Sequence, residues 1–242
     1  METANGLSNV IVGIVDTGTD ASHFEFAGVL NDSIRVGTVN LGSTDSFSKN
    51  DGDANGHGTQ IAGIIGANNV LGRGGQLSAD SQHMNGIISG AFPNFDDYTL
   101  EVRRSTLSLS GIWGAINSIR KSGGKIINLS IGLVKSSALN HEQINEIDNQ
   151  ITSDTLFSFY EAALDFKFNR HKDDILFVVA GGNESVSAEN ALPASLGNLA
   201  NVMTVAATEL DDTRAEFIED ISESNFGNVV GLFFTLTPFN RF

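Results

Sequence analysis

Four short runs of apolar, mostly β-branched residues are spread along the 242-residue chain. Near-continuous apolar runs of this length are typical of strands that are buried on both faces of a parallel sheet. The four runs are Val10–Val15, Lys125–Ile131, Ile175–Ala180 and Asn201–Ala207. The pattern therefore predicts four buried strands.

Two segments between these runs carry apolar residues at helical spacing. The first has its apolar face at Ile112, Ala115, Ile116 and Ile119. Ser108 or Ser110 is its expected N-cap, and Gly123-Gly124 provides a left-handed end. The second segment covers about residues 154–168, and a shorter apolar segment, Ile61–Ile65, also favours a helix.

Strands that alternate with helices predict an α/β fold, with a mostly parallel sheet, right-handed crossovers and helices on its faces. No linker composition interrupts the chain, so residues 1–242 are interpreted as a single domain. The polar stretches Asn40–Asn55 and Val134–Gln150 are expected to be surface excursions, and Gly72–Val102 shows no clear pattern.

Composition narrows the range of functions. The formal charge of −15 disfavours nucleic acids and anionic membrane surfaces as partners, because both are negatively charged. No apolar run reaches the roughly 20 residues of a membrane span. The chain has no cysteine, which excludes disulfides and thiolate chemistry, and its first residues lack the pattern of a signal peptide.

Three polar motifs lie at the ends of predicted elements, where parallel sheets bind ligands. Asp16-Thr17-Gly18 follows the first strand, Gly56-His57-Gly58-Thr59 opens the short helix, and Gly181-Gly182-Asn183 follows the third strand. Each motif alone is more typical of a turn or a cap than of a functional site. Their order along the chain is more informative than any one of them.

The order of these motifs resembles the subtilisin-like serine peptidases (subtilases, peptidase S8), in which the catalytic residues follow one another as Asp, His, Ser. The resemblance covers residues 10–233. Its motifs are Val12-Gly-Ile-Val-Asp-Thr-Gly-Thr-Asp20, Gly56-His-Gly-Thr-Gln-Ile-Ala-Gly63, Ile127-Asn-Leu-Ser-Ile-Gly132, Val178-Val-Ala-Gly-Gly-Asn183, Leu192-Pro-Ala194, Val202-Met-Thr-Val-Ala-Ala207 and Ser224-Asn-Phe-Gly227. Gln60 departs from the family, which commonly has His there, but it is not a triad position.

The resemblance implies a subtilisin-like three-layer fold and endopeptidase activity on polypeptide substrates, with no cofactor required for catalysis. It implies that Asp16 orients His57, that His57 is the general base, and that Asn183 donates to the oxyanion. The segments matching the walls of the specificity pocket are Ser130, Ile131 and Gly132, and Ala180, Gly181 and Gly182. It also implies secretion or a cell-surface location; substrate preference and oligomeric state are left open.

Two geometric expectations follow from this resemblance. Asp16, His57 and Asn183 should converge at one edge of the sheet. The side chains of Asp16 and His57 should lie within hydrogen-bond reach, about 2.6–3.2 Å.

The family's nucleophile segment, Gly-Thr-Ser-x-Ala, is absent from the 242 residues. Gly231 replaces the family's Asp, and the residues after Phe233 depart from its pattern. Ser130 and Ser195 match other parts of the family's pattern. We therefore expect an inactive fragment whose C-terminal part is missing, with irregular packing of Phe234–Phe242. The alternative is a pseudopeptidase, a peptide-binding module that keeps the cleft without catalysis.

Three further hypotheses have less support. An aspartic peptidase would need a second Asp-Thr/Ser-Gly, and a dinucleotide-binding domain would need Gly-x-Gly-x-x-Gly after the first strand; neither motif is in the sequence. Asp51, Asp53 and Asn55 place oxygens at alternate positions, which leaves a structural calcium site open. A solvated acidic loop is the favoured interpretation of these three residues, and no metal ligand is assigned.

Overall fold

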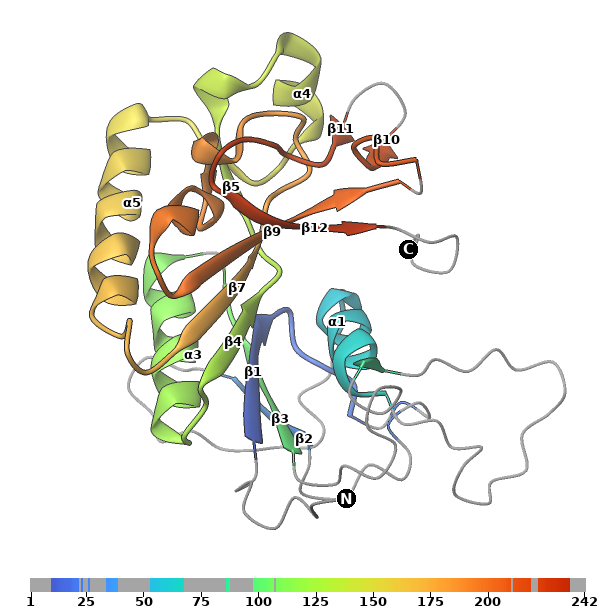
Figure 1. The fold of residues 1–242 in the computed structure, drawn as a ribbon, viewed down its shortest axis with the longest axis vertical. Helices are drawn as coiled ribbons and strands as arrows, with labels where there is room; N and C mark the ends of the chain where they lie inside the picture. The colour runs from blue at the N-terminus through green and yellow to red at the C-terminus, as the bar shows by residue number, and fades with distance from the viewer. Residues whose placement is uncertain are drawn as a thin grey trace, which may run out of the picture. The chain divides into compact units, whose positions relative to one another are not determined.

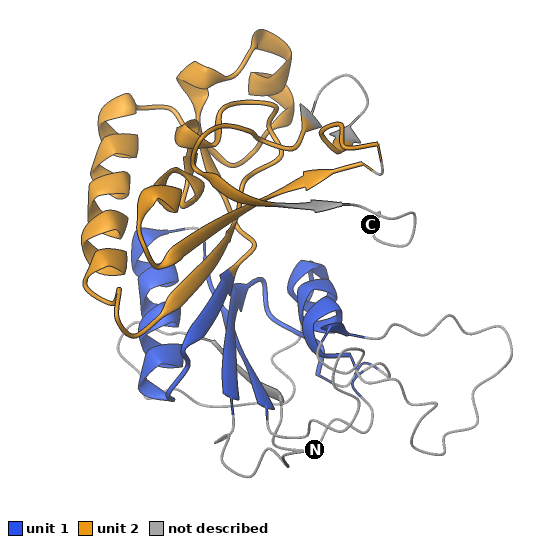
Figure 2. Cartoon of the chain, in the orientation of Figure 1, with its two compact units in different colours: residues 1–128 blue, residues 129–242 orange. Residues whose placement is uncertain are grey.

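The computed structural model describes residues 10–21, 23, 26, 34–38, 53–67, 86–87, 98–106, 108–209, 211–218 and 222–235. The chain forms two compact units, residues 1–128 and residues 129–242 (Figure 2). Each unit contains parallel strands and a buried apolar core. The interpretation of residues 1–242 as a single peptidase domain stays a prediction.

The first unit is built on parallel strands. Strand β1 lies between β3 and β4 and is parallel to both, and β2 is parallel to β3 on its other side. The bounds are β1 Val10–Asp16, β2 Ile34–Thr38, β3 Tyr98–Arg104 and β4 Ile126–Leu129, with helices α1 His57–Gly66 and α3 Leu109–Lys121 (Figure 1). Strand β1 and helix α3 confirm the corresponding sequence predictions.

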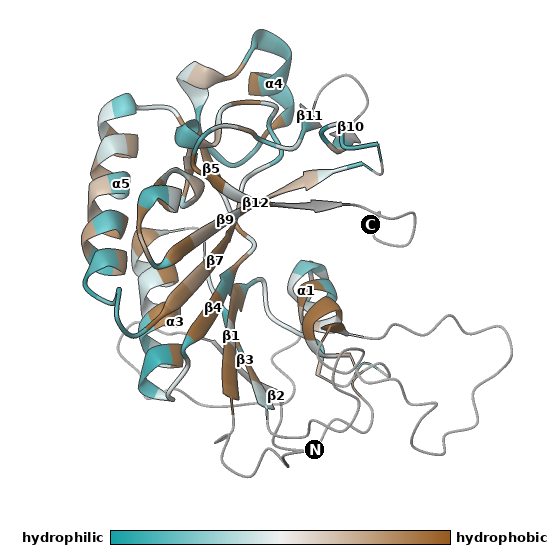
Figure 3. Cartoon of the chain, viewed as in Figure 1, coloured by the Kyte–Doolittle hydropathy of each residue, from teal (hydrophilic) through white to brown (hydrophobic). Residues whose placement is uncertain are grey.

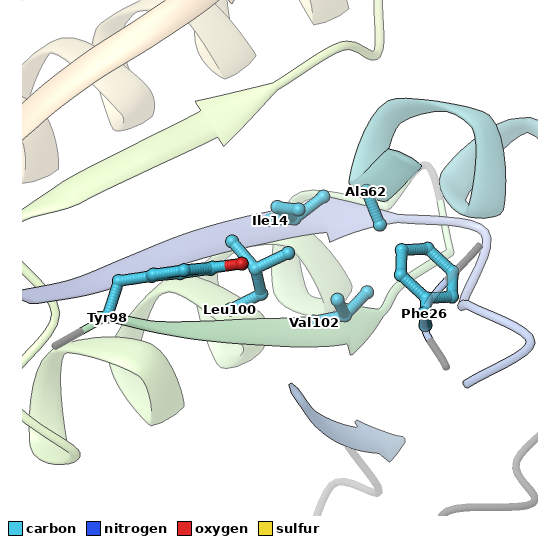
Figure 4. Close-up of a cluster of buried hydrophobic side chains, with 6 residues drawn as sticks. All are labelled: Ile14, Phe26, Ala62, Tyr98, Leu100 and Val102. Atoms are coloured by element: carbon cyan, nitrogen blue, oxygen red, sulfur yellow. The ribbon is translucent and has the colours of Figure 1, made fainter. Parts of the chain in front are cut away.

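Helices α1 and α3 cover opposite faces of these strands. Successive side chains of a strand point to opposite faces. On one face Ile14, Leu100 and Val102 form a buried cluster with Ala62 of α1 (Figure 4). On the other face Gly13 lies so close to α3 that a Cβ there would come within 2.4 Å of Ile119. The first unit therefore has the expected three layers of helix, sheet and helix.

The ends of α3 follow the sequence signals. The Oγ of Ser108 accepts a hydrogen bond from the backbone N–H of Gly111 at 3.1 Å, which identifies Ser108 rather than Ser110 as the N-cap. Gly123 has a φ of 96°, a left-handed conformation that glycine adopts at little cost. The helix therefore begins and ends at signals that are local in the sequence.

In the second unit β9 lies between β7 and β12 and is parallel to both, and β5 and β6 form a further parallel pair. Its elements are β5 Leu133–Lys135, α4 His141–Glu146, β6 Gln150–Ile151, α5 Asp154–Asn169, β7 Leu176–Ala180, β8 Ala191–Leu192, β9 Val202–Thr208, β10 Glu216–Ile218, β11 Ser222–Glu223 and β12 Val230–Thr235, with 3₁₀ turns at Ser136–Ala138, Ala188–Asn190 and Ala194–Asn198. Helix α5 packs on β7 through the stacked rings of Phe168 and Phe177, whose centroids are 3.9 Å apart. Strands β7 and β9 confirm the positions of two predicted strands, and Figure 3 shows that both are rich in apolar residues. Their burial alternates along the strand, however, and Leu176 and Met203 are exposed.

Three sequence-based expectations about local structure were wrong or incomplete. The predicted strand Lys125–Ile131 ends at Leu129, so the residues matched to the first pocket wall follow the strand instead of lying in it. The stretch Val134–Gln150 contains β5, α4 and the start of β6 instead of being only a surface excursion. Of the stretch Asn40–Asn55, only residues 53–55 are described.

Strand β3 was missed because polar residues interrupt its apolar pattern. Glu101 and Arg103 are buried on the face that meets α3, where the guanidinium of Arg103 pairs with the Glu101 carboxylate. The Nε of Arg103 also donates to the Oγ of Ser118 at 2.9 Å. A strand that buries a charged pair in this way does not show the continuous apolar run of its neighbours.

The end of the chain was predicted only in part. Phe234 lies in β12, in register with Ala207 of β9, so it belongs to a regular strand and not to an irregular tail. Residues 232–235 are apolar, aromatic or β-branched, and residues of these kinds favour a strand. Residues 236–242 lie outside the described residues.

Candidate active site

Asp16 and His57 form a close pair in the first unit. The Nδ1 of His57 lies 2.7 Å from the Oδ1 of Asp16, which confirms the predicted hydrogen-bond reach. The Asp16 side chain is fully buried, whereas the His57 side chain keeps 44% of its surface exposed. The imidazole is therefore anchored on one edge by a buried carboxylate while part of the ring remains accessible to a substrate.

The position of Asp16 follows from the end of β1. Asp16 is the last residue of this buried strand, and its Oδ1 also accepts a hydrogen bond from the backbone N–H of Thr17 at 2.7 Å. Its Oδ2 is buried and has no hydrogen-bond partner within the described part of the chain. Because Oδ1 already contacts Nδ1, this buried carboxylate can stabilise an imidazolium once His57 gains a proton.

His57 is the first residue of α1, and glycines on both sides of it are required by geometry. Gly56 has a φ of 89°, in the left-handed region that glycine favours. A Cβ on Gly58 would lie 2.1 Å from the backbone oxygen of Gly18, so α1 approaches the turn after β1 more closely than alanine would allow. The Oδ1 of Asn55 accepts a hydrogen bond from the backbone N–H of His57 at 3.2 Å.

Asp53 completes the start of α1 and links it to the turn after β1. Its carboxylate accepts hydrogen bonds from the backbone N–H of Gly56 at 3.0 Å and of Thr59 at 2.8 Å, and from the hydroxyls of Thr17 and Thr59 at 2.8 Å each. Because Gly56 has no side chain, Asp53 takes the place of an N-cap. From the sequence, Asp53 was considered only as a calcium ligand. Its position four residues before His57 is the feature that could have indicated a role at the start of α1.

Two pKa values in this cluster are shifted. The hydrogen bond to Asp16 raises the pKa of His57 above its ordinary value, against an opposing effect of burial, and the negative charges of Asp16 and Asp53 raise it further. Burial raises the pKa of Asp53, but its hydrogen bonds to Thr59, Thr17 and Gly56 outweigh this and leave it lowered. His57 is therefore a stronger base than a free imidazole, and Asp53 is ionised at neutral pH.

Two of the three residues considered for calcium, Asp53 and Asn55, make hydrogen bonds to the start of α1. Both oxygens of Asp53 accept hydrogen bonds from the start of α1, and the Oδ1 of Asn55 accepts one. Asp51 lies outside the described residues. No group of three or more His, Asp or Glu side chains suited to a metal ion occurs in the described ranges. Within those same ranges, no helix is both long and apolar enough to cross a membrane.

In the second unit, Asn183 lies in a turn that directly follows β7. Its side chain is exposed, and its backbone N–H donates to the Oε2 of Glu184 at 2.9 Å. Gly182, just before it, has a φ of 102°, and a Cβ there would lie 2.3 Å from the Nδ2 of Asn225. Both features make glycine necessary at Gly182.

Asn225 holds this turn in place. Its Nδ2 donates to the backbone oxygen of Gly181 at 3.0 Å and to the Oε2 of Glu184 at 2.7 Å. Its Oδ1 accepts from the backbone N–H groups of Glu184 and Val186, each at 3.0 Å. The amide thus uses its full hydrogen-bonding capacity while fully buried. The motif Ser224-Asn-Phe-Gly227 is part of the family resemblance, but the sequence predicted no role for Asn225.

The other predicted residues have clear local positions in the second unit. Ser130, Ile131 and Gly132 lie between β4 and β5, Ala180 ends β7, and Gly181 and Gly182 begin the turn that carries Asn183. Ser195 lies in the 3₁₀ turn Ala194–Asn198 with a buried Oγ, which is consistent with a role other than nucleophile. The predicted convergence of Asn183 with the Asp16–His57 pair stays a prediction.

Residues 8–230 match the model of the subtilase family, Peptidase_S8. The chain is 30% identical to alkaline protease 1 of Emericella nidulans over 223 residues, which are 91% of this chain and 41% of that protein. It is 30% identical to a cuticle-degrading serine protease of Arthrobotrys oligospora over 247 residues, covering 96% of this chain and 44% of that protein. The chain thus spans less than half the length of these two relatives.

Solved structures give the same fold. A cold-adapted subtilisin-like serine proteinase matches 93% of this chain and 62% of its own chain, with a TM-score of 0.58 and 22% identity. The epidermin leader peptide processing serine protease of Staphylococcus aureus matches 93% of this chain and 51% of its own, with a TM-score of 0.59 and 19% identity. These similarities confirm the predicted α/β, subtilisin-like fold.

Proposed function

The chain belongs to the subtilase family, and from this membership we propose that it carries the acid–base and oxyanion groups of a subtilisin-like serine endopeptidase. The reaction is hydrolysis of peptide bonds in polypeptide substrates. The observation that carries the proposal is the 2.7 Å contact between Nδ1 of His57 and the buried Oδ1 of Asp16. Buried carboxylate, imidazole and serine in this order form the catalytic triad of such enzymes.

Asp16 sets the protonation state of His57. Because a carboxylate only accepts hydrogen bonds, the Nδ1 of His57 carries the proton and Nε2 keeps its lone pair. Nε2 then takes the proton of a serine hydroxyl as that oxygen attacks the scissile carbonyl, and later returns it to the leaving amine. Asp16 stabilises the imidazolium that forms.

Asn183 is the proposed oxyanion donor, since its side chain is exposed at the end of β7 while the turn beneath it is fixed by Asn225. Its Nδ2 would donate to the oxygen that becomes negative in the tetrahedral intermediate. We assign the pocket walls to Ser130–Gly132 and Ala180–Gly182. No cofactor takes part in this mechanism. A location outside the cell, as the name of the cuticle-degrading relative suggests for that protein, is part of the same proposal.

The 242 residues contain no Gly-Thr-Ser-x-Ala segment to supply the nucleophile. Proton abstraction by His57 has no effect unless a serine oxygen lies beside it. We therefore propose that these residues alone do not hydrolyse peptides. The same absence favours, as a second candidate, a binding module that keeps the cleft without catalysis; a nucleophile segment encoded in the DNA after the codon for Phe242 would exclude it.

The decisive experiment joins a subtilase C-terminal portion, including its Gly-Thr-Ser-x-Ala helix, after Thr235, where β12 ends. The fused protein should hydrolyse a peptide substrate, and His57→Ala should abolish this activity. Asn183→Ala should lower kcat by about 10²–10³, the usual cost of losing an oxyanion donor. A fused protein that folds but is inactive, or one whose activity survives His57→Ala, would overturn the proposal.

A fluorophosphonate probe applied to the unfused chain is the matched control. It should not label the chain, because the sequence contains no serine in the family's nucleophile segment. Strong labelling that is lost on His57→Ala would show that a serine within the 242 residues serves as nucleophile, contrary to the proposal.

A further inference from the structure

We propose that Asp53 is a positioning residue for the Asp16–His57 pair, holding the helix that carries His57 against the turn that follows Asp16. The role is mechanical and electrostatic, and Asp53 itself touches no reacting atom. The proposal rests on the proposed function, because the position of His57 matters to chemistry only if His57 is the base.

The first support is the way Asp53 fixes α1. Its Oδ2 accepts from both the backbone N–H and the hydroxyl of Thr59, and its Oδ1 accepts from the backbone N–H of Gly56. These donors lie on both sides of His57 in the sequence. Since His57 is the first residue of α1, fixing Gly56 and Thr59 fixes the backbone from which the imidazole projects.

The second support is a link from Asp53 to the strand that carries Asp16. The hydroxyl of Thr17 donates to the Oδ1 of Asp53 at 2.8 Å and accepts from the backbone N–H of Gly58 at 2.9 Å. Thr17 is bonded directly to Asp16. The path from Asp16 through Thr17, Asp53 and the start of α1 to His57 is then closed by the 2.7 Å contact of the pair. Because these contacts form a closed path, the imidazole of His57 has little freedom to move away from Asp16.

The third support is charge. The described charged groups that act on His57 are Asp16 from β1 and Asp53 from the segment before α1. Arg104 lies opposite Asp16 in the register of β1 and β3, but its side chain is exposed. Asp53 thus adds a second negative charge, fixed by its own hydrogen bonds, that acts on the imidazole, which must become positive during the reaction.

The test uses NMR on the unfused chain and needs no catalysis. The low-field signal of the His57 Nδ1 proton and the pH midpoint of its ring signals report the contact with Asp16, and His57→Ala assigns both among the five histidines. Asp53→Asn removes the charge and one acceptor while keeping the shape. Thr17→Val removes the hydroxyl that links Asp53 to the turn, together with the bond that this hydroxyl accepts from the backbone N–H of Gly58. Asp173→Asn, an exposed carboxylate elsewhere, is the control for total charge.

We expect Asp53→Asn to broaden or abolish the Nδ1 signal and to move the His57 midpoint to lower pH. Thr17→Val should weaken the same signal with a smaller change of midpoint, because the charge of Asp53 remains. Asp173→Asn should change neither. If Asp53→Asn does not fold, Asp53→Ser, which removes the charge and leaves a single acceptor oxygen, decides the question, and the parent's signal and midpoint in this variant would overturn the proposal. A folded Asp53→Asn or Thr17→Val protein with the parent's signal and midpoint would overturn the proposal, whereas failure of the proposed function would show only in the fused enzyme.

Discussion

At the residue scale, His57 gains its properties from its neighbours. An isolated imidazole between glycines could serve many roles, but here a buried carboxylate 2.7 Å from Nδ1 fixes the tautomer and raises the pKa. A group whose pKa is higher in the folded chain than in the unfolded chain binds its proton more tightly when folded. Its protonation therefore stabilises the fold, and this contribution depends on pH.

The pH dependence has a definite sign. The stabilisation from protonated His57 should be fully present below the unfolded pKa, about 6.5, and should be lost as the pH rises through the raised folded pKa. The measurement is the free energy of unfolding by urea, for the parent and for His57→Gln, between about pH 5.5 and 9. The difference between the two proteins should shrink with rising pH. If the difference in unfolding free energy stays constant or grows as the pH rises, the raised pKa of His57 would be contradicted.

At the scale of elements, the turn after β7 depends on a residue that lies more than 40 positions later. Asn225 satisfies two backbone N–H groups and two oxygens of residues 181–186. Asn225 stabilises the fold mainly because it keeps these polar groups paired. Leaving a buried polar group unpaired costs more free energy than a typical hydrogen bond contributes. The same bonds fix the backbone that carries Asn183.

Asn225→Ala should lower the free energy of unfolding by about 2–4 kcal/mol, because the N–H groups of Glu184 and Val186 would lose their acceptor inside the protein. Asn228→Ala is the matched control, since Asn228 is exposed in the next turn, and it should change stability by less than about 0.5 kcal/mol. Denaturant titration of both variants gives the comparison. Equal losses in the two would refute a special role for Asn225.

At the scale of the whole molecule, the main feature is a large excess of negative charge. With 29 acidic and 14 basic residues, the chain carries a formal charge of −15. Like charges repel one another more strongly in the compact state than in the expanded unfolded chain. Dissolved salt screens this repulsion, with a screening length of about 10 Å at 0.1 M.

Raising sodium chloride from about 0.02 to 0.5 M should therefore increase the thermal midpoint of the 242-residue chain. Potassium chloride should have the same effect at equal ionic strength, because screening depends on charge and not on the identity of the ion. The measurement is a thermal melt followed by circular dichroism. A midpoint that falls with salt would mean that favourable ion pairs outweigh the net repulsion.

The sequence by itself determined the elements and the chemistry that depend on local or periodic signals. The apolar runs located β1, β7 and β9, Ser108 and Gly123 located the ends of α3, and the motifs around Asp16 and His57 identified the family. These predictions succeed because apolar runs, helix caps and motif order are all signals carried by residues that are adjacent in the sequence.

Only the tertiary structure decided the rest. Strand β3 is a buried strand because Glu101 and Arg103 pair with each other beneath α3, which no apolar pattern could indicate. Asp53, which the sequence suggested only as one of three oxygen-bearing loop residues, is a hydrogen-bonding partner of Thr17 and Thr59, since its contacts depend on which donors surround it. Partners that come together only on folding determine what a polar residue does, because a polar group must find a partner when it is buried and the sequence does not say which one.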